Sequence, residues 1–266
     1  MGDLVHKRAL YSQLARYYDR IYWNKDYDRE VEFLVNLFHR QGVTGRKLLE
    51  VGCGTGNHTK AFVARGYEVT GVDLSSEVLR VAREKVRRGA KFVRGDMRDL
   101  DAVVQGEYDA VVCLFSTISY NLTTSDLRKT VSGFHRHTIG RGVVAFDTHF
   151  TKKAFLDGYR GEDIFDDGRA IGARLSVSKR SGDVGEISFT YLIKDGGKVI
   201  TLRDDIHRFG LFDQEEFLEV LEEVGFRPHA YSDWTFRKSR GTAAFKDTVF
   251  VGCKRGPPRN CDADRV

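Results

Sequence analysis

One stretch decides how the fold is interpreted: Lys47-Leu48-Leu49-Glu50-Val51-Gly52-Cys53-Gly54-Thr55-Gly56. Leu48, Leu49 and Val51 form an apolar run that only Glu50 interrupts, which is typical of a strand buried on both faces. The glycines that follow indicate a tight turn at the start of a helix, because glycine lets the backbone turn sharply and approach a ligand closely. On its own, the stretch predicts a nucleotide-binding turn of unspecified kind.

The spacing of the glycines separates this turn from two common phosphate-binding motifs. A dinucleotide fingerprint runs G-x-G-x-x-G, and a P-loop contains a lysine. Here the glycines fall at 52, 54 and 56, and Asn57 follows the last glycine in place of the lysine that a P-loop needs. Glu50 lies just before the first glycine, where its carboxylate would repel a pyrophosphate. The turn therefore suits a ligand with a positively charged end.

Three more strands are expected after the turn, over residues 67–73, 90–95 and 108–115. The first ends in Asp73, about 20 residues past the turn, where a carboxylate can accept hydrogen bonds from both hydroxyls of a ribose. The second strand is followed by Asp96, and the third runs into residues 116–120. With Glu50, acids end three successive strands, and this set is more specific than the glycine turn alone.

The segment E-V-G-C-G-T-G closely resembles motif I of the class I S-adenosylmethionine-dependent methyltransferases. The resemblance implies a Rossmann-like α/β fold with a doubly wound, mostly parallel sheet. It also implies a cofactor with an ammonium and a sulfonium group, S-adenosyl-L-homocysteine as the product, and a contact of Asp96 with the adenine amino group. The cofactor-binding residues that it implies are Tyr18, Tyr27, Glu50, Gly52, Cys53, Gly54, Asp73, Leu74, Asp96, Met97 and Phe115.

The composition fits one domain with an elaboration, since the chain has 266 residues, of which 41% are hydrophobic and 3 are proline. It has no apolar stretch of membrane-spanning length and no signal-peptide core, so no membrane partner is expected. The cysteines at 53, 113, 253 and 261 lack the spacing of a zinc site or a disulfide framework. We therefore expect no metal and a reducing, cytoplasmic setting.

Residues 1–45 are expected to form an aromatic lid followed by a helix. Aromatic side chains gather there: Tyr11, Tyr17, Tyr18, Tyr22, Trp23 and Tyr27. From Asp26 onward, apolar residues recur at helical spacing and predict a helix docked on the sheet. The earlier tyrosines fit plain core packing less well, because a buried hydroxyl needs a hydrogen-bond partner. A lid over the cofactor is favoured, and plain packing is the alternative.

Residues 46–150 and 211–253 are expected to form the cofactor-binding domain, interrupted by an antiparallel β meander over residues 151–210. Hairpin turn signals punctuate the insertion: Asp166-Asp167-Gly168, Ser181-Gly182-Asp183 and Asp195-Gly196-Gly197. Its strands are apolar on one face only. That face has to cover the mouth of the site, a second subunit, or both.

The stretch around the fifth strand supplies a further candidate residue. A helix that starts after Thr123 is expected to end at Gly140, and a strand over residues 142–147 follows. The chain then releases His149 near the carboxyl edge of the sheet. His149 is either a general base or a structural residue.

The net charge of +5 raises the question of a nucleic-acid partner. Basic residues cluster along one helix and the next strand: Arg80, Arg83, Lys85, Arg87, Arg88, Lys91, Arg94 and Arg98. This stretch is either a nucleic-acid patch or the solvated face of an amphipathic helix. Because no aromatic residues alternate with the charges, the solvated face is favoured and no nucleic-acid partner is expected. Residues 254–266 are expected to be a basic tail.

Over nearly its whole length, the chain resembles the nucleotide-aminosugar N,N-dimethyltransferases. The matching stretches are Tyr18-Asp19 with Tyr22, Lys25-Asp26-Tyr27, Gly95-Asp96-Met97-Arg98-Asp99, Leu114-Phe115-Ser116, Tyr120, Asp205-Ile206-His207 and Leu211-Phe212. The resemblance implies that Tyr22 and Tyr120 lie near the acceptor, and that the inserted sheet shapes the acceptor site and a homodimer. The segment Asp147-Thr148-His149-Phe150 replaces a tryptophan-rich segment of that family, so the resemblance leaves the sugar open.

The predicted function is transfer of a methyl group from S-adenosylmethionine to a small-molecule acceptor by in-line displacement, in which positioning dominates. The predicted acceptor is an amine such as a nucleotide-linked aminosugar. Tyr22, Tyr120 and His149 are the catalytic candidates, because tyrosine and histidine can accept or relay the proton of an amine. An alcohol acceptor would need a stronger base, for which His149 is the best candidate. RNA or protein methylation requires the basic stretch to be a binding surface, and the intact strand-end acids disfavour a non-catalytic cofactor-binding subunit.

Overall fold

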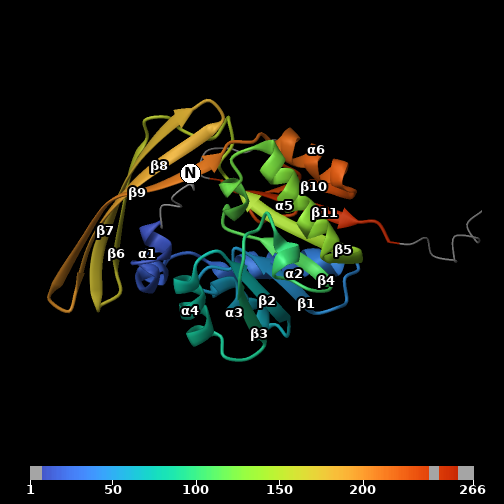
Figure 1. Ribbon diagram of the computed structural model, residues 1–266, viewed down its shortest axis with the longest axis horizontal. Helices are drawn as coiled ribbons and strands as arrows, with labels where there is room; N and C mark the ends of the chain where they lie inside the picture. Colours follow the sequence, from blue (N-terminus) through green and yellow to red (C-terminus); the bar gives the residue numbers. More distant parts are fainter. Residues whose placement is uncertain (1–7, 240–245, 257–266) are drawn as a thin grey trace, which may run out of the picture.

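The strand that precedes the glycine turn lies within the central sheet of the computed structural model, which describes residues 8–239 and 246–256 (Figure 1). The sheet has seven strands in the order β10-β11-β5-β4-β1-β2-β3, and among these described strands only β11 is antiparallel to its neighbours. The strands are β1 (Lys47–Val51), β2 (Glu68–Asp73), β3 (Ala90–Arg94), β4 (Tyr108–Cys113), β5 (Thr138–Thr148), β10 (Phe226–Ser232) and β11 (Thr248–Lys254). The predicted doubly wound, mostly parallel fold is confirmed.

Helices cover both faces of this sheet. They are α2 (Tyr27–Arg40), α3 (Asn57–Ala64), α4 (Ser76–Lys85), α5 (Thr124–Arg136) and α6 (Gln214–Val224). Because strand side chains alternate between faces, Val111 packs in the cluster that α5 and α6 complete, and Val112 packs in the cluster with α2 and α3. Leu48 and Leu49 are both fully buried for the same reason.

One helix boundary differs from the prediction. Thr123 caps α5 as expected, since its hydroxyl accepts the backbone N–H of Asp126, the third residue of the helix. Gly140 does not end this helix, which stops at Arg136. Strand β5 begins at Thr138, which pairs with Tyr108 of β4. Strand pairing therefore takes residues that the apolar spacing had assigned to the helix.

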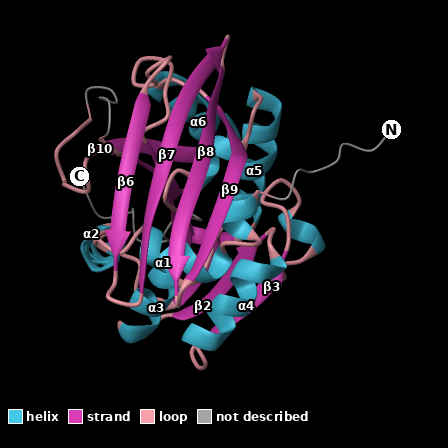
Figure 2. Cartoon of the chain, turned by 90° about the vertical axis from the view of Figure 1, so that its left-hand side faces the viewer, coloured by secondary structure: helices cyan, strands magenta, loops and turns pink. Residues whose placement is uncertain are grey.

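The segment of the chain that follows β5 and precedes α6 forms a second sheet, which is antiparallel and four-stranded (Figure 2). Its strands are β6 (Arg160–Asp166), β7 (Ala170–Ser181), β8 (Val184–Asp195) and β9 (Lys198–Gly210). The inner face packs on the N-terminal segment, residues 8–26, through a cluster that joins Leu10, Leu14 and Tyr17 to Tyr191 and Ile193. The outer face exposes apolar side chains: Ile164, Ile171, Leu175, Val177, Leu192, Val199 and Ile206.

The chain end differs from the expected basic tail at its first residue. Lys254 is the last residue of β11, and its ammonium donates hydrogen bonds to the carbonyl oxygens of His135 (2.8 Å) and Thr138 (2.6 Å). These contacts fix Lys254 because they satisfy carbonyl groups at the edge of α5 and β5. The expected tail over residues 257–266 lies outside the described residues. None of the described helices combines the length and the apolar character that a bilayer crossing requires.

Candidate active site

The candidate active site lies at the carboxyl edge of the central sheet, where the N-terminal segment crosses the ends of β1 and β2. The Asp19 carboxylate accepts hydrogen bonds from the Thr55 hydroxyl (2.6 Å) and the Asn57 amide (2.9 Å) beside the glycine turn. The Ser75 hydroxyl after β2 donates to the backbone carbonyl of Tyr11. The N-terminal segment is therefore fastened over this edge by polar contacts.

The glycine turn has a left-handed backbone at three positions, with φ of 72° at Gly52, 53° at Gly54 and 78° at Gly56. A Cβ at Gly52 would meet Thr117 Cγ2 at 2.3 Å, whereas a Cβ at Gly54 would meet nothing within 4 Å. Gly52 is thus required by close packing. Gly54 faces open space, where a ligand can approach the backbone.

Asp73 is held beside this open space by the backbone. Its two carboxylate oxygens each accept one N–H, from Gly54 and from Ser75, both at 2.9 Å. Each oxygen keeps a further lone pair. Burial raises the pKa of Asp73, although these N–H groups oppose the change. The carboxylate is therefore oriented and retains acceptor capacity.

Glu50 lies deeper, with 1% of its surface exposed. Its carboxyl accepts a hydrogen bond from the Thr59 hydroxyl. Burial raises the pKa of Glu50 to about 8, and the charge of Asp73 adds to the increase. A cation nearby would favour the ionised form, so a ligand with a positive end complements this carboxyl.

The remaining strand-end residues lie on the rim of the site. Asp96 pairs with the guanidinium of Arg98 through two contacts of 2.9 and 2.6 Å, and the hydrogen bonds of Arg98 lower the pKa of the Asp96 carboxyl. Met97 Sδ accepts the Asn121 side-chain amide at 3.9 Å. Leu74 is exposed. No described contact joins these residues to the tyrosines, and the contact of Asp96 with an adenine stays a prediction.

Three aromatic side chains pack together, two from the N-terminal segment and one from the turn after β4. The Tyr18 and Tyr22 rings lie 4.8 Å apart, and the Tyr22 ring meets the Phe115 ring edge-on at 5.0 Å. The Tyr22 hydroxyl accepts a hydrogen bond from Arg174 of the inserted sheet at 2.6 Å. Tyr27 packs against His58, in the first turn of α3 directly after the glycine turn, and its hydroxyl is buried without a hydrogen-bond partner in the described chain.

Tyr120 lies at the other side of the N-terminal segment, in the short 3-10 helix Thr117–Tyr120. Its hydroxyl forms hydrogen bonds with the Tyr11 hydroxyl (2.8 Å) and with His207 Nδ1 (2.7 Å). Burial raises the pKa of Tyr120 far above its usual range, so the hydroxyl stays protonated at neutral pH.

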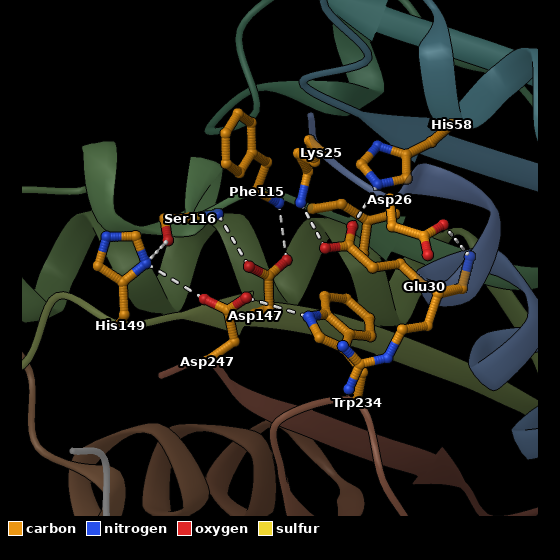
Figure 3. Close-up of polar contacts among 12 residues, drawn as sticks. Lys25, Asp26, Glu30, His58, Phe115, Ser116, Asp147, His149, Trp234 and Asp247 are labelled. Atoms are coloured by element: carbon orange, nitrogen blue, oxygen red, sulfur yellow. Dashed lines mark hydrogen bonds and ion pairs between the residues drawn. The ribbon is translucent and has the colours of Figure 1, made fainter. Parts of the chain in front are cut away.

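Asp147, at the end of β5, fixes the turn that carries Phe115 (Figure 3). It is 1% exposed, and its oxygens accept the backbone N–H of Phe115 at 2.7 Å and of Ser116 at 3.1 Å. Both of these residues have a left-handed backbone, with φ of 58° and 56°. Burial, reinforced by the neighbouring Asp247, raises the pKa of Asp147.

His149 belongs to the same hydrogen-bond network as Ser116 and Asp247. Its Nδ1 lies 3.3 Å from the Ser116 hydroxyl and 3.2 Å from Asp247 Oδ1, and Trp234 donates to the other oxygen of Asp247 at 3.0 Å (Figure 3). Among the hydrogen bonds of the described chain, none joins His149 to Tyr22 or Tyr120. The three catalytic candidates thus occupy separate hydrogen-bond networks.

Several polar residues of the site were not among the site residues that the sequence analysis predicted. The missed residues are Tyr11, Arg174, Asp205, Asp247, Glu30 and His58. Glu30 joins the Lys25 ammonium to His58 Nε2 (2.7 Å), and Lys25 lies 4.2 Å from the centre of the Phe115 ring. Tyr11 was expected only as part of the aromatic lid, and Lys25 and Asp205 stood in stretches that resemble the aminosugar methyltransferases, but no motif indicated a role for these three side chains.

The basic stretch is partly engaged within the protein. Lys85, assigned to a solvated face, instead turns inward and pairs with Asp19 at 2.7 Å. Arg80 pairs with Glu84 one helical turn away at 2.6 Å. Within the part of the chain that the structure describes, no group of three or more histidine, cysteine or acidic side chains is arranged to hold a metal ion.

Comparisons with known proteins agree with this geometry. A family model described as a methyltransferase domain matches residues 48–142. The dTDP-3-amino-3,4,6-trideoxy-alpha-D-glucopyranose N,N-dimethyltransferase of Streptomyces venezuelae is 32% identical over 216 residues, which cover 80% of this chain and 90% of the relative. The dTDP-3-amino-3,6-dideoxy-alpha-D-glucopyranose N,N-dimethyltransferase of Streptomyces fradiae is 30% identical over 215 residues, which cover 80% of this chain and 83% of the relative.

Solved structures give the same result. A sugar N-methyltransferase from a Streptoalloteichus species superposes with a TM-score of 0.78 at 29% identity, and the match covers 96% of each chain. The fold, the glycine turn and the strand-end acids therefore occur together in a protein whose relatives are methyltransferases. The chain belongs to the class I S-adenosylmethionine-dependent methyltransferases, as its sequence predicted, and is similar to those that methylate nucleotide-linked aminosugars.

Proposed function

We propose that the protein transfers a methyl group from S-adenosylmethionine to the amino group of a nucleotide-linked aminosugar. The observation that carries this proposal is the agreement of the two relatives, both named as N,N-dimethyltransferases of dTDP-aminosugars and each matched over 80% of this chain. The cluster of Tyr18, Tyr22 and Phe115 supports it. The adjacent Asp19 bonds to Thr55 of the glycine turn and Tyr22 bonds to Arg174 of the inserted sheet, so an acceptor at this cluster would lie beside the cofactor.

The cofactor is proposed to lie on the glycine turn. Three observations support a fit: Gly54 faces open space, Asp73 retains acceptor capacity, and the Tyr27 hydroxyl is buried without a partner in the described chain. Glu50 would complement the positive end of the ligand. The other proposed contacts are Tyr18, Gly52, Cys53, Leu74, Asp96, Met97 and Phe115. Calorimetry on Asp73→Ala tests this site, and unchanged affinity would remove Asp73 from it.

The bound cofactor supplies an electrophilic methyl group on a sulfonium. The chain has to hold an amine in its neutral form with its lone pair toward that methyl group, and to exclude water. We assign this role to Tyr22 and Tyr120. Because the Tyr120 hydroxyl stays protonated, it orients the amine by hydrogen bonding and does not act as an anionic base.

Methylation of a hydroxyl group is the second candidate, and one observation favours it. His149 lies 3.2 Å from Asp247, and a carboxylate beside an imidazole is the arrangement that strengthens a general base. The bond from His149 to Ser116 supports the opposite view, in which the imidazole has a structural role. The two candidate functions are distinguished by the group that is methylated, an amine in the first and a hydroxyl in the second.

An assay with methyl-labelled S-adenosylmethionine separates these functions. The purified protein is offered a dTDP-aminosugar, the same sugar with a hydroxyl in place of the amine, free small amines, and RNA. Label on the aminosugar alone is the expected result, and the number of methyl groups transferred is read by mass spectrometry. Label on the hydroxyl sugar would establish the second candidate, and label on RNA would overturn both.

A second copy of the chain is the partner proposed for the outer face of the inserted sheet. Seven apolar side chains are exposed there, and an isologous contact would cover the same patch on both copies. Sedimentation of the wild type and of Leu175→Glu tests this, since a monomeric wild type would contradict it. The proposed compartment is the cytoplasm, where thiols such as the buried, unpaired Cys53, Cys113 and Cys253 stay reduced.

A further inference from the structure

Strand β9 contains a bulge that changes which of its side chains face the site. Pairing with β8 joins Tyr191 to Leu202 and Phe189 to Asp205, so β9 has one more residue than β8 between these pairs. Asp204 lies in the bulge, exposed and with φ of 57°. Because side chains alternate along a strand, one extra residue reverses the two faces beyond it.

The reversal turns two polar side chains inward. Beyond the bulge, Asp205 is 4% exposed and His207 is 2% exposed, whereas Ile206 between them is 41% exposed. Without the bulge, Ile206 would be buried and its neighbours solvated. Burying two titratable groups in place of an apolar one is unfavourable unless their hydrogen bonds compensate. Placing Asp205 and His207 in the interior therefore costs desolvation free energy, which their hydrogen bonds have to offset.

Asp205 and His207 lie at one end of a series of hydrogen bonds that leads to Tyr120. Asp205 Oδ2 lies 3.2 Å from His207 Nε2, and His207 Nδ1 lies 2.7 Å from the Tyr120 hydroxyl. The Tyr120 hydroxyl lies 2.8 Å from that of Tyr11. This series of hydrogen bonds thus links the inserted sheet to Tyr120.

Burial and the surrounding charges determine the protonation states of His207 and Asp205. Burial lowers the pKa of His207, and the guanidinium groups of Arg8 and Arg174 lower it further against the opposing effect of Asp205. Burial raises the pKa of Asp205, but the hydrogen bonds from His207 and from two backbone N–H groups of the N-terminal segment outweigh it and leave the value lowered. Near neutral pH, His207 is neutral and Asp205 is ionised.

This protonation state fixes the direction of each hydrogen bond. An ionised Asp205 accepts the proton on His207 Nε2, so Nδ1 has a lone pair and accepts the Tyr120 proton. The only hydroxyl proton of Tyr120 is then in use, and Tyr11 has to donate to Tyr120 Oη. One lone pair of Tyr120 Oη remains, and it can accept a hydrogen bond but not donate one.

We propose that Asp205 and His207 are positioning residues that hold the Tyr120 hydroxyl as a hydrogen-bond acceptor for an N–H of the acceptor amine. The inference rests on the proposed N-methylation and deepens it. An amine held through its N–H keeps its lone pair free for attack on the methyl group. Protonation of His207 reverses the arrangement: Nδ1–H donates to Tyr120, whose O–H then points at the amine lone pair and blocks attack.

The first test compares His207→Phe, Tyr120→Phe and the double variant by kcat/KM for the acceptor. Each single variant is expected to lose roughly tenfold, as for an orienting hydrogen bond. The double variant should lose no more than Tyr120→Phe alone, because His207 acts through that hydroxyl. His137→Phe is the matched control, a buried histidine that pairs with Asp101 (3.1 Å) at the opposite edge of the sheet and should leave kcat/KM unchanged.

The second test is the pH profile. Protonation of the amine alone gives an acid limb in which log kcat/KM rises by one per pH unit. The wild type should steepen to a slope of two below the pKa of His207, which lies under the usual histidine value. His207→Phe should keep a slope of one throughout. Additive losses in the double variant, or a wild-type limb that never steepens, would overturn the proposal.

Nitrogen NMR of the imidazoles gives a readout that needs no methyl transfer. His207 is expected as the Nε2–H tautomer, with an Nδ1 resonance that moves in Tyr120→Phe, and an Nδ1–H tautomer would overturn the proposal. If the proposed function is wrong and the positioning role is right, the wild type would methylate no aminosugar, but His207 would still be found as the Nε2–H tautomer. The kinetic tests would then be run on the amine that the acceptor assay identifies, and equal effects of His207→Phe and His137→Phe there would refute the positioning role.

Discussion

Replacing Asp147 with asparagine should loosen the turn that presents Phe115 to Tyr22. The carboxylate accepts the N–H of Phe115 at 2.7 Å and the N–H of Ser116 at 3.1 Å. An amide keeps one acceptor oxygen and places an NH₂ group opposite the other N–H. One of the two backbone donors is then left unpaired in a buried position.

The magnitude follows from these two donors. An unpaired buried N–H costs about 1–3 kcal/mol, so Asp147→Asn should lower the free energy of unfolding at pH 7 by about 2 kcal/mol. Asp147→Ala leaves both donors unpaired and should cost about 4 kcal/mol. The left-handed backbone of Phe115 and Ser116 costs a further ~1–2 kcal/mol per residue, so a turn without Asp147 should relax to another conformation. Cofactor affinity should fall with it.

Urea unfolding as a function of pH checks the electrostatic part. Burial and Asp247 raise the pKa of Asp147. The stability that this carboxyl contributes is therefore complete below its unfolded pKa of about 3.9 and is lost as the pH rises through the raised value. The difference between the wild type and Asp147→Asn should narrow as the pH rises.

Asp101→Asn is the control for this experiment. Asp101 is half exposed and pairs with Arg136 at 2.6 Å, and a surface pair of this kind contributes about 0–1 kcal/mol. The reasoning is refuted if Asp147→Asn is as stable as the control and binds cofactor normally. A stability difference that widens with pH would refute the electrostatic part alone.

The other predictions concern the cofactor site and the basic stretch. Burial raises the pKa of Glu50 to about 8, and a cationic ligand binds the ionised carboxylate better than the neutral acid. The cofactor affinity of the wild type, measured by calorimetry, should therefore rise as the pH passes through 8, whereas that of Glu50→Gln should show no rise. Tyr27→Phe removes a buried hydroxyl that has no partner in the described chain, so it should leave the melting temperature of the free protein unchanged or higher while cofactor affinity falls roughly tenfold; equal affinity would place the hydroxyl outside the site. Arg87→Glu and Arg88→Glu change exposed residues and should leave methyl transfer unaffected, and a filter assay that detects RNA binding resistant to salt would contradict this.

The glycine turn and the strand ends were readable from the sequence because their cause is local. A buried strand must be apolar, the turn at Gly54 needs a left-handed backbone, and both requirements are visible in one chain segment. The helix that was expected to end at Gly140 shows the limit of this approach. Its true end is set by the pairing of Thr138 with Tyr108, a partner that is remote in sequence.

The polar residues of the site show the same limit more strongly. Alternation along β9 predicts that Ile206 is buried and that its two neighbours face solvent, and the bulge at Asp204 reverses this. A bulge with a non-glycine residue has no reliable signal in a single sequence. The partners of Tyr120, Tyr22 and Asp147 come from segments that only tertiary packing brings together.

Two of the contacts that hold the N-terminal segment differ in burial, and this difference sets an order of events during turnover. Asp205 holds one end by accepting the buried N–H groups of Ala9 (2.7 Å) and Leu10 (3.0 Å), which no water could easily replace. Asp19 holds the other end beside the glycine turn, with a side chain that is 38% exposed. Water can take over the bonds of Asp19 at little cost. The segment should therefore swing open from the cofactor side while its root on the inserted sheet stays closed, so that amide exchange is faster around Asp19 than at Ala9 and Leu10.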